Sequence, residues 1–284
     1  MNISSRNFFI LLLSFVCLSV SCFSQLIDLG LRDWKTSIET PYNLKKKIDI
    51  PVCIGAVALI GGGFVLKTFK TPLTDEELAH PDTSKIPSFD LSAIHQANPS
   101  YQKASDILEI TAMALPFIAY VDKRVSGHGS QIVAIYLETL AIDFAAYNVT
   151  TGIVNRHRPL TYNTDTTEVP LKTRKGPSVK ESFFSGHTCN AATATFCGAK
   201  IFTDLRPHSK LVPFVWIAAA GVPAFTAYSR YKAGKHFPSD VIVGYIVGAS
   251  IGYFVPQLHK YATPDKLSLA PAFDEKGLVM TYTF

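Results

Sequence analysis

The sequence predicts an all-α fold: a membrane-embedded bundle of about six core helices, followed by a short C-terminal β-hairpin. Two observations predict it. The 284-residue chain is 48% hydrophobic and only 17% charged, and its mean hydropathy of +0.19 is high for a soluble protein and excludes a disordered one. Apolar stretches of helical length also recur along the chain, separated by polar loops that contain proline.

Residues 1–24 have the layout of a secretory signal peptide or an N-terminal anchor. Arg6 precedes the apolar run FFILLLSFVCLSV, and small residues then lead to Ser24. A lipoprotein signal that ends at Cys22 is the alternative, but Ser19 stands where such signals carry an aliphatic residue. We therefore expect export, either with cleavage near Ser24 or with the segment retained as an anchor.

The apolar stretches differ in how well they suit a membrane. Three lack charged residues and approach the roughly 20 apolar residues that a spanning helix needs. Two others carry carboxylates, among them Glu109 and Glu138, which are costly in lipid unless they face other helices. The interior of a soluble helical domain is therefore an alternative. The predicted helices cover residues 50–66, 106–121, 131–150, 188–203, 211–227 and 240–257.

Polar segments divide the chain into four parts. In the first long loop, TDEEL at 74–78 predicts a short capped helix outside the membrane. A second long loop, at 159–182, is rich in Thr and Pro and then basic. Near the end, the turn-like DEKG and the alternation that follows predict the hairpin. The parts are the signal or anchor (1–24), an N-terminal segment with the first apolar helix and the extramembrane loop (25–104), the helical core (105–257) and the tail (258–284).

Composition argues against a nucleic-acid-binding protein. The net charge is +5, but the 27 Lys and Arg are scattered rather than gathered in one run. A mild positive charge instead suits an anionic substrate or lipid. The five Cys include no metal-type C-x-x-C pair and no disulfide framework.

Three short motifs at the ends of the predicted helices hold the residues that suggest chemistry. They are NRHRP from Asn155, SFFSGHT from Ser182 and SRYKAGKHFPSD from Ser229. If successive helices alternate in direction, all three lie at one end of the bundle. We expect a phosphate-like anion to bind between them.

The first two motifs offer donors to phosphate oxygens. Arg156 and Arg158 stand two apart, before a proline that favours extended backbone, so both guanidinium groups could fork onto the anion. The small residues Ser185 and Gly186 let backbone N–H groups approach an anion at a helix N-terminus. His187 then stands where it could protonate a leaving group.

The third motif offers a nucleophile. Arg230 could bind a further oxygen, His236 has a ring nitrogen available for attack, and Asp240 could accept the proton of the other ring nitrogen. Each motif alone is common in turns and helix starts. Two histidines, three arginines and an aspartate at the ends of charge-poor helices together predict an active site.

In these motifs the chain resembles the type 2 phosphatidic acid phosphatase superfamily, which includes membrane-associated lipid phosphatases, class A acid phosphatases and vanadium-dependent haloperoxidases. The family signature is Lys, six residues, Arg-Pro; then Pro-Ser-Gly-His; then Ser-Arg, five residues, His, three residues, Asp. The last part is complete here, and order and spacing cover residues 105–257. Two positions depart from the signature: Phe184 replaces the proline, and Thr151 replaces a lysine that binds phosphate.

The resemblance implies a metal-independent phosphatase that acts through a phosphohistidine and needs no cofactor. His236 would attack phosphorus, Asp240 would orient it, and His187 would protonate the leaving alcohol and later activate water. Arg156 or a basic residue at 172–180 would replace the charge of the lysine. The residues expected to hold phosphate are Arg158, Arg230, Ser185, Gly186, Arg156 and Thr151.

The six other histidines show no ligand-like spacing, so we expect them to be solvated or packed side chains and assign no metal ligand. They are His80, His95, His128, His157, His208 and His259.

Apolar helices that end at the motifs favour a phosphorylated lipid as substrate: phosphatidate, phosphatidylglycerol phosphate, undecaprenyl diphosphate or a lipid A phosphate. The first alternative is a soluble-type periplasmic acid phosphatase of broad specificity. The others are a vanadate-dependent haloperoxidase and, because of Thr151, a lipid-phosphate binder without turnover. The expected partners are thus a phosphorylated substrate and the membrane, and no nucleic acid.

Positive charges predict a site that faces the periplasm of a bacterial-type cell envelope. Lys45–Lys47, Lys123-Arg124 and the Arg206–Lys210 loop all fall at the end opposite the motifs, and positive loops favour the cytoplasm. Cleavage before Gln25 conflicts with this orientation because it would place Lys45–Lys47 outside. Either residues 1–24 are not a simple cleaved signal, or one weak segment does not span, or the bundle is only membrane-associated.

Overall fold

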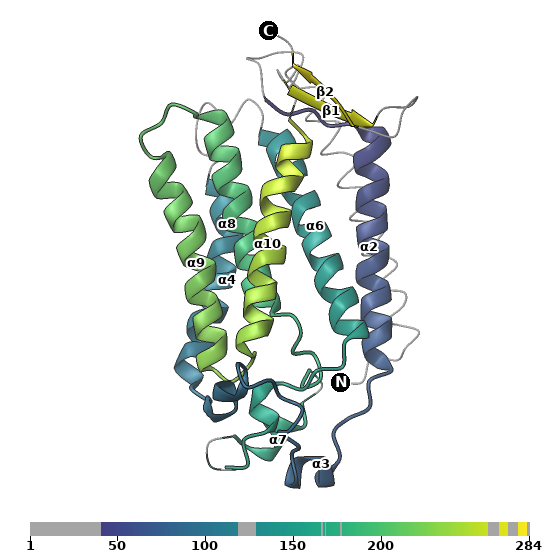
Figure 1. The fold of residues 1–284 in the computed structure, drawn as a ribbon, viewed down its shortest axis with the longest axis vertical. Helices are drawn as coiled ribbons and strands as arrows, with labels where there is room; N and C mark the ends of the chain where they lie inside the picture. Colours follow the sequence, from purple (N-terminus) through teal and green to yellow (C-terminus); the bar gives the residue numbers. More distant parts are fainter. Residues whose placement is uncertain are drawn as a thin grey trace.

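The computed structural model describes residues 41–118, 129–165, 167, 169–176, 178–260, 267–271 and 278–282. The predicted signal or anchor, together with Lys123, Arg124 and His128, lies outside the described residues. Within them the chain is a bundle of long, roughly parallel helices (Figure 1). The predicted all-α bundle is therefore confirmed.

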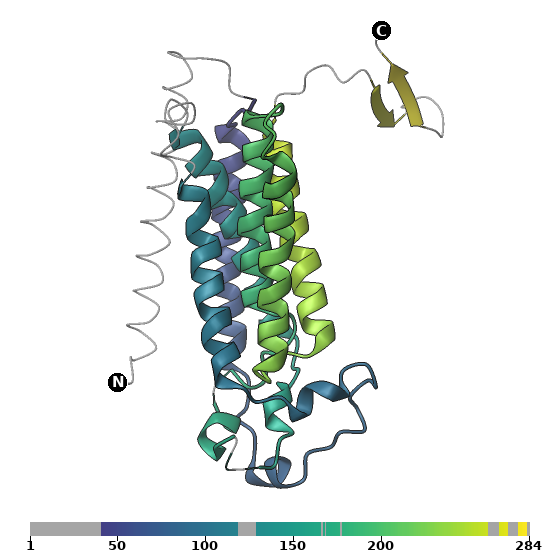
Figure 2. The same ribbon diagram turned by 90° about the vertical axis from the view of Figure 1, so that its left-hand side faces the viewer.

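All six predicted helices are present. α4 starts earlier than expected because Pro99 is well suited to the first turn of a helix, where its missing N–H costs nothing. The helices run alternately up and down the bundle (Figures 1 and 2). They are α2 (Lys46–Thr68), α4 (Pro99–Ile118), α6 (Gly129–Ile153), α8 (Gly186–Leu205), α9 (Val212–Lys232) and α10 (Pro238–Leu258).

Short elements occupy the loops. The predicted extramembrane helix is α3 (Asp75–Ala79), where the Thr74 hydroxyl accepts from the Glu77 N–H and the Glu77 carboxylate accepts from the Thr74 N–H. α3 and α7 lie together beyond one end of the bundle (Figure 1). The remaining short helices are η1 (Leu91–His95), η3 (Pro159–Thr161) and α7 (Leu171–Arg174).

Two antiparallel strands lie in the tail, at the place where the alternation predicts a hairpin. They are β1 (Leu267–Pro271) and β2 (Leu278–Tyr282), with Leu269 opposite Met280 in the register.

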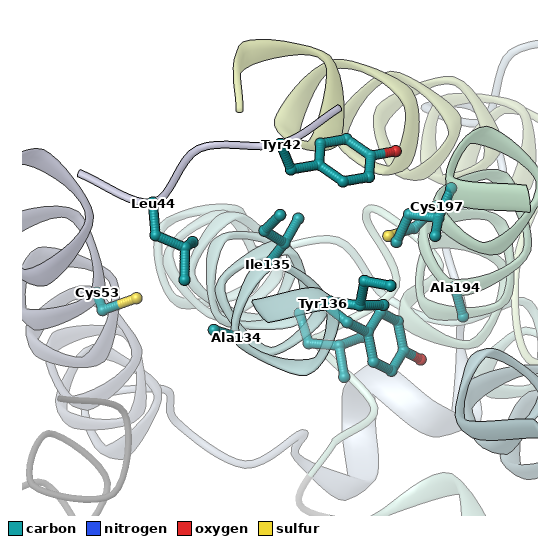
Figure 3. Packing of buried hydrophobic residues seen from close by; sticks show 11 residues of the cluster. Tyr42, Leu44, Cys53, Ala134, Ile135, Tyr136, Ala194 and Cys197 are labelled. Atoms are coloured by element: carbon teal, nitrogen blue, oxygen red, sulfur yellow. The ribbon is translucent and has the colours of Figure 1, made fainter. Parts of the chain in front are cut away.

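α8 is the central helix and contacts α4, α6, α9 and α10. Its residues are mainly small, so neighbouring helices can approach it closely. On the side toward α6 and α2 they join a buried cluster that includes Tyr136, Ala194 and Cys197, and that Tyr42 closes at one end (Figure 3). α8 is less apolar than a spanning helix because it meets protein rather than lipid on most sides.

Four of the described helices, α2, α6, α9 and α10, are long and apolar enough to cross a membrane. Large apolar side chains stand exposed on their outer faces, including Leu59, Phe214 and Ile246, as expected of helices surrounded by lipid rather than water. The carboxylates predicted to be costly in lipid point inward instead: Glu138 is 3% exposed and Asp143 is fully buried. The bundle is therefore membrane-embedded.

α8 and α10 pack with their backbones in direct contact. Gly244, Gly248 and Gly252 recur every four residues on α10 and face the α8 chain; a Cβ on Gly248 would lie 2.2 Å from the carbonyl oxygen of Cys189. A side chain at any of the three would push the helices apart. This stripe of glycines sets how closely the α8 N-terminus approaches the start of α10.

Replacing Gly248 by Ala is expected to force this contact open, because the obstructing atom belongs to the backbone. Overpacking of this kind costs about 1–3 kcal/mol, so the Tm of the detergent-solubilised protein should fall. Gly221→Ala is the matched control, since nothing lies within 4 Å of a Cβ placed there; it should be neutral or stabilise by about 0.5–1 kcal/mol. Equal Tm values for the two variants would contradict the role given to the contact.

Candidate active site

The three motifs meet at one end of the bundle, as alternating helix directions predict. Asp240 at the start of α10 accepts hydrogen bonds from Ser182 of the second motif and from Arg156 of the first. Arg230 at the end of α9 reaches Asp106 in the first half of α4. Residues that are far apart in sequence therefore share one site.

His236 has the properties of a nucleophile. Its side chain is 1% exposed, and Nδ1 donates to the Ser182 carbonyl oxygen at 2.7 Å. Burial, followed by the positive charges of Arg158 and Arg230, holds the pKa of His236 well below its usual range, so the ring is neutral at pH 7. With the proton on Nδ1, the lone pair lies on Nε2, to which no described residue bonds.

Asp240 positions His236 indirectly. The sequence analysis expects its carboxylate to accept the Nδ1 proton, but Asp240 Oδ2 lies 3.9 Å from Nδ1 and the Ser182 carbonyl takes that proton. Oδ2 instead accepts the Ser182 hydroxyl at 2.6 Å and the Phe237 N–H at 2.9 Å. The carboxylate thus fixes the residues on both sides of the imidazole, and the expected direct contact is corrected.

Arg156 is not available to phosphate in this arrangement, contrary to the sequence prediction. One terminal nitrogen donates to Asp240 and to the Ser239 hydroxyl, and the other donates to Asp90 Oδ2 at 2.6 Å. The guanidinium also lies over the Phe237 ring, 4.4 Å from its centroid. Its charge is needed here because two buried carboxylates face it.

Asp90 is a site residue that the sequence analysis missed. It is 1% exposed and accepts the Ser239 N–H and hydroxyl as well as Arg156. It lies in the loop between α2 and α4, to which no chemistry was assigned. An isolated aspartate in a polar loop carries no signal of burial.

Arg158 and Arg230 have donors left for an anion. Arg158 is 9% exposed and uses Nε on the Ser178 carbonyl, and its terminal nitrogens have no described partner. Arg230 bonds to Ser105 and Asp106 through one terminal nitrogen, and its buried Nε has no partner. Both therefore keep the predicted capacity to bind phosphate oxygens.

Ser185 and Gly186 begin α8, as predicted. Ser185 is the N-cap residue, and its hydroxyl is within 3.0 Å of that of Thr188. A Cβ on Gly186 would lie 2.8 Å from the Tyr147 ring, so no larger residue fits there without displacing Tyr147. The free N–H groups of this first turn, with the helix dipole behind them, favour a bound anion.

His187 faces two carboxylates from α4. Its Nε2 lies 2.9 Å from Asp106 Oδ1 and 3.1 Å from Glu109 Oε2. The sequence analysis treated Asp106 and Glu109 only as charges in a helix. Their position explains why a helix near lipid keeps them: they hold the His187 ring at the edge of the site.

Comparison with known families gives a match that spans all three motifs, from residue 132 to residue 264, to the PAP2 superfamily. This part of the chain is similar to the PAP2 superfamily. Over 83 residues, 29% of the chain, it is 34% identical to a protein from Porphyromonas gingivalis named lipid A 4′-phosphatase. That match covers 32% of the relative, so the chain matches about a third of its length. Among solved structures, a transmembrane PAP2-type phosphatidylglycerolphosphate phosphatase from Bacillus subtilis is similar with a TM-score of 0.41 and 18% identity, over 72% of this chain and 94% of that one.

Thr151, at the position of the PAP2 signature lysine, does not replace it. The residue is fully buried, and its hydroxyl donates back to the Tyr147 carbonyl at 2.7 Å within α6. Three of the four basic residues at 172–180 are engaged elsewhere: Arg174 donates to backbone carbonyls, Lys175 pairs with Asp75, and Lys180 reaches Thr71. Lys172 is exposed, and no described contact places it at the site.

Lys235 is the cation that the sequence analysis overlooked. It directly precedes His236, and its backbone N–H donates to the Arg230 carbonyl at 3.1 Å. Its half-buried side chain has no described partner. Burial, and then the charges of Arg158 and Arg230, lower the pKa of Lys235 to about 8. Lys235 therefore lies among the cations of this PAP2 site, with its ammonium uncommitted.

A cavity of 410 Å³ lies beside the candidate active site but does not include its two histidines. It is lined by the loop after α2 and by Arg156 and Phe237, but neither His236 nor His187 lines it.

Replacing Lys235 by Met is expected to weaken binding of inorganic phosphate about 10–100-fold near pH 6.5, the effect of losing one charge-assisted contact of about 1.5–3 kcal/mol. Lys235 is cationic below its pKa and neutral above it, so the advantage of the wild type should vanish as the pH rises through about 8. Isothermal titration calorimetry with inorganic phosphate, repeated for each protein from pH 6.5 to above pH 8, measures this difference in Kd.

Lys235→Arg is the matched control, because it keeps the charge at every pH in the series. Comparing proteins at each pH cancels the titration of phosphate itself. A wild type to Lys235→Met ratio that stays constant across pH 8 would contradict the assignment.

Proposed function

We propose that this protein is a metal-independent phosphatase that hydrolyses a phosphate ester on a lipid through a phosphohistidine at His236. The single observation that carries the proposal is the state of that side chain: buried, neutral, with its proton fixed on Nδ1 and its Nε2 lone pair unused. Arg158, Arg230 and the first turn of α8 surround it with donors suited to a phosphoryl group.

Each step of the proposed reaction can be assigned to a residue of the site. Nε2 of His236 attacks phosphorus as the ester P–O bond breaks, and His187 gives a proton to the leaving alcohol oxygen. The Ser182 carbonyl stabilises the charge that develops on the ring through its bond to Nδ1. Water, activated by His187, then cleaves the P–N bond and releases inorganic phosphate. Arg158, Arg230 and Lys235 neutralise the phosphoryl oxygens throughout.

A lipid is supported as the bearer of the phosphate by the surroundings of the site. A shallow apolar groove of 200 Å³ runs between the end of α9 and the start of α10, lined by Ala227, Tyr228, Tyr231, Pro238, Val241 and Ile242. It lies next to the segment that carries His236 and would offer an acyl chain a route from the bilayer. The relative named lipid A 4′-phosphatase supports the same substrate class.

The test is phosphate release from detergent-dispersed phosphatidate, undecaprenyl diphosphate and lipid A, with EDTA present and with a soluble phosphomonoester in parallel. Wild type should release phosphate, and His236→Ala should lose it by roughly four orders of magnitude, because no other group forms the covalent intermediate. His95→Ala, at an exposed position, is the matched control. Faster release from the soluble ester than from every lipid would favour an acid phosphatase of broad specificity. Phosphate binding with no release would leave a lipid-phosphate binder.

We also propose that the site faces the periplasm, because Lys45–Lys47 and the Arg206–Lys210 loop lie at the other end of the bundle. The exposed Thr83 lies at the site end, and the exposed Lys210 lies at the other end. In a background with Cys17 and Cys22 replaced by Ser, Thr83→Cys should react with a membrane-impermeant maleimide in intact cells. Lys210→Cys should react only after permeabilisation, and the reverse pattern would overturn the orientation. The remaining cysteines, Cys53, Cys189 and Cys197, are buried.

A further inference from the structure

Three ionisable side chains meet at the end of the bundle away from the active site. Asp49 belongs to the first turn of α2, Glu138 to α6, and His259 follows the last residue of α10. They are only 4%, 3% and 6% exposed, and one ligand atom from each lies within 4.8 Å of the others. None of them takes part in the proposed hydrolysis.

The orientation of His259 makes this cluster unusual. Its Nδ1 donates to the Val255 carbonyl oxygen at 2.9 Å, because a carbonyl can only accept. In the neutral ring Nε2 is therefore left with a lone pair, and it points at two carboxylates: Asp49 Oδ1 at 3.4 Å and Glu138 Oε2 at 3.2 Å. Among the residues that the structure describes, neither His259 Nε2 nor Glu138 Oε2 makes a hydrogen bond, although both atoms are buried. Three electron-rich atoms that face one another in a dry interior repel unless a proton on Nε2 or a metal cation lies between them.

We propose that Asp49, Glu138 and His259 form a binding site for a divalent cation of the zinc class. Donors held about 2.0–2.1 Å from a tetrahedral ion are roughly 3.3 Å apart, which agrees with the separations from Nε2 of 3.4 Å and 3.2 Å. The charges agree as well, since two carboxylates and a neutral imidazole balance a doubly positive ion. A nitrogen ligand favours zinc over magnesium or calcium, which prefer oxygen.

The bond from Nδ1 to the Val255 carbonyl is the outer contact that such a site needs. Histidines that bind metals commonly donate the other ring N–H to a carbonyl or carboxylate, which fixes the tautomer and the ring orientation. Asp49 is held in the same way, because its second oxygen accepts the Lys45 N–H at 2.6 Å. The ligands are thus positioned before any ion arrives.

The ion would act as a structural clamp. It joins α2, α6 and the end of α10, where Asn43 N–H also donates to the His259 carbonyl and Tyr42 pairs with Lys260. α10 has 21 residues, so this end lies about 30 Å from the end that carries His236. The ion would therefore hold helices together without touching the reaction.

The experiment uses the full chain, purified in detergent with an affinity tag that lacks histidine. After removal of metal with dipicolinate, the protein is exposed to Zn²⁺ and desalted, and zinc is counted by mass spectrometry. We expect about one zinc per chain for the wild type and at least a tenfold loss for His259→Gln and Glu138→Gln. His208→Gln, an exposed histidine at the same end of the bundle, should keep its zinc.

Cobalt provides a readout that needs no variant. Co²⁺ added to the wild type should give the intense visible absorption of a tetrahedral site, and Zn²⁺ should abolish it. Folded wild type that binds neither ion would overturn the proposal, since a single proton on Nε2 would then be what relieves the repulsion. Because the readout is metal content and not phosphate release, failure here is distinct from failure of the proposed hydrolysis.

Discussion

The direct backbone contact between α8 and α10 is the constraint on which the site depends. Glycines at 244, 248 and 252 let α10 approach α8 so closely that the Ser185 N–H donates to the Asp240 carbonyl at 3.1 Å. This bond joins the first residue of the anion-binding turn to the helix that follows His236. Since lipid provides no hydrophobic drive between helices, close packing of small residues is what holds such a pair together. The distance between the proposed nucleophile and the proposed phosphate donors is thus set along the whole length of the interface.

Buried ion pairs then hold in place the loops at the site end of the bundle, which the contacts between helices do not fix. Arg156 lies between Asp240 and Asp90, so the first motif, the start of α10 and the loop before α4 are tied to a single guanidinium. Removing one partner of such a network commonly costs about 3–5 kcal/mol, because the other charges stay buried without compensation. Arg156, two residues before the signature arginine Arg158, therefore acts through the architecture of the site. Asp240 has the same character: it fixes Ser182 and Phe237, and these flank the imidazole.

The sequence predicts the helices and most of the site because both have a local signal. Apolar runs of sufficient length specify the six long helices of the bundle. The spacing from Ser229 to Asp240 specifies the turn that presents His236. Asp90, Lys235 and the cluster of Asp49, Glu138 and His259 could not be found in this way. The significance of Asp90 and of the cluster comes from contacts with residues more than 50 positions away, which hydropathy along one segment does not record. Lys235 stands inside the third motif, but only the packed structure shows that Arg158 and Arg230 lie close enough to lower its pKa. Arg156 and Thr151 were misassigned for the same reason, since only the packed structure shows that their polar atoms are already bonded.

The side chains at the two ends of α10 leave uncompensated charge of opposite sign. At its start, Arg158, Arg230 and Lys235 present positive charge that exceeds what the described carboxylates beside them use, so the site favours a multiply charged anion. At its end, the carboxylates of Asp49 and Glu138 both face the Nε2 atom of His259, an arrangement that favours a cation between them. Burial makes each imbalance costly, because water cannot screen it. Charge left uncompensated in a low-dielectric interior is therefore the feature that marks a binding site at each end, and the sign of that charge indicates what binds there.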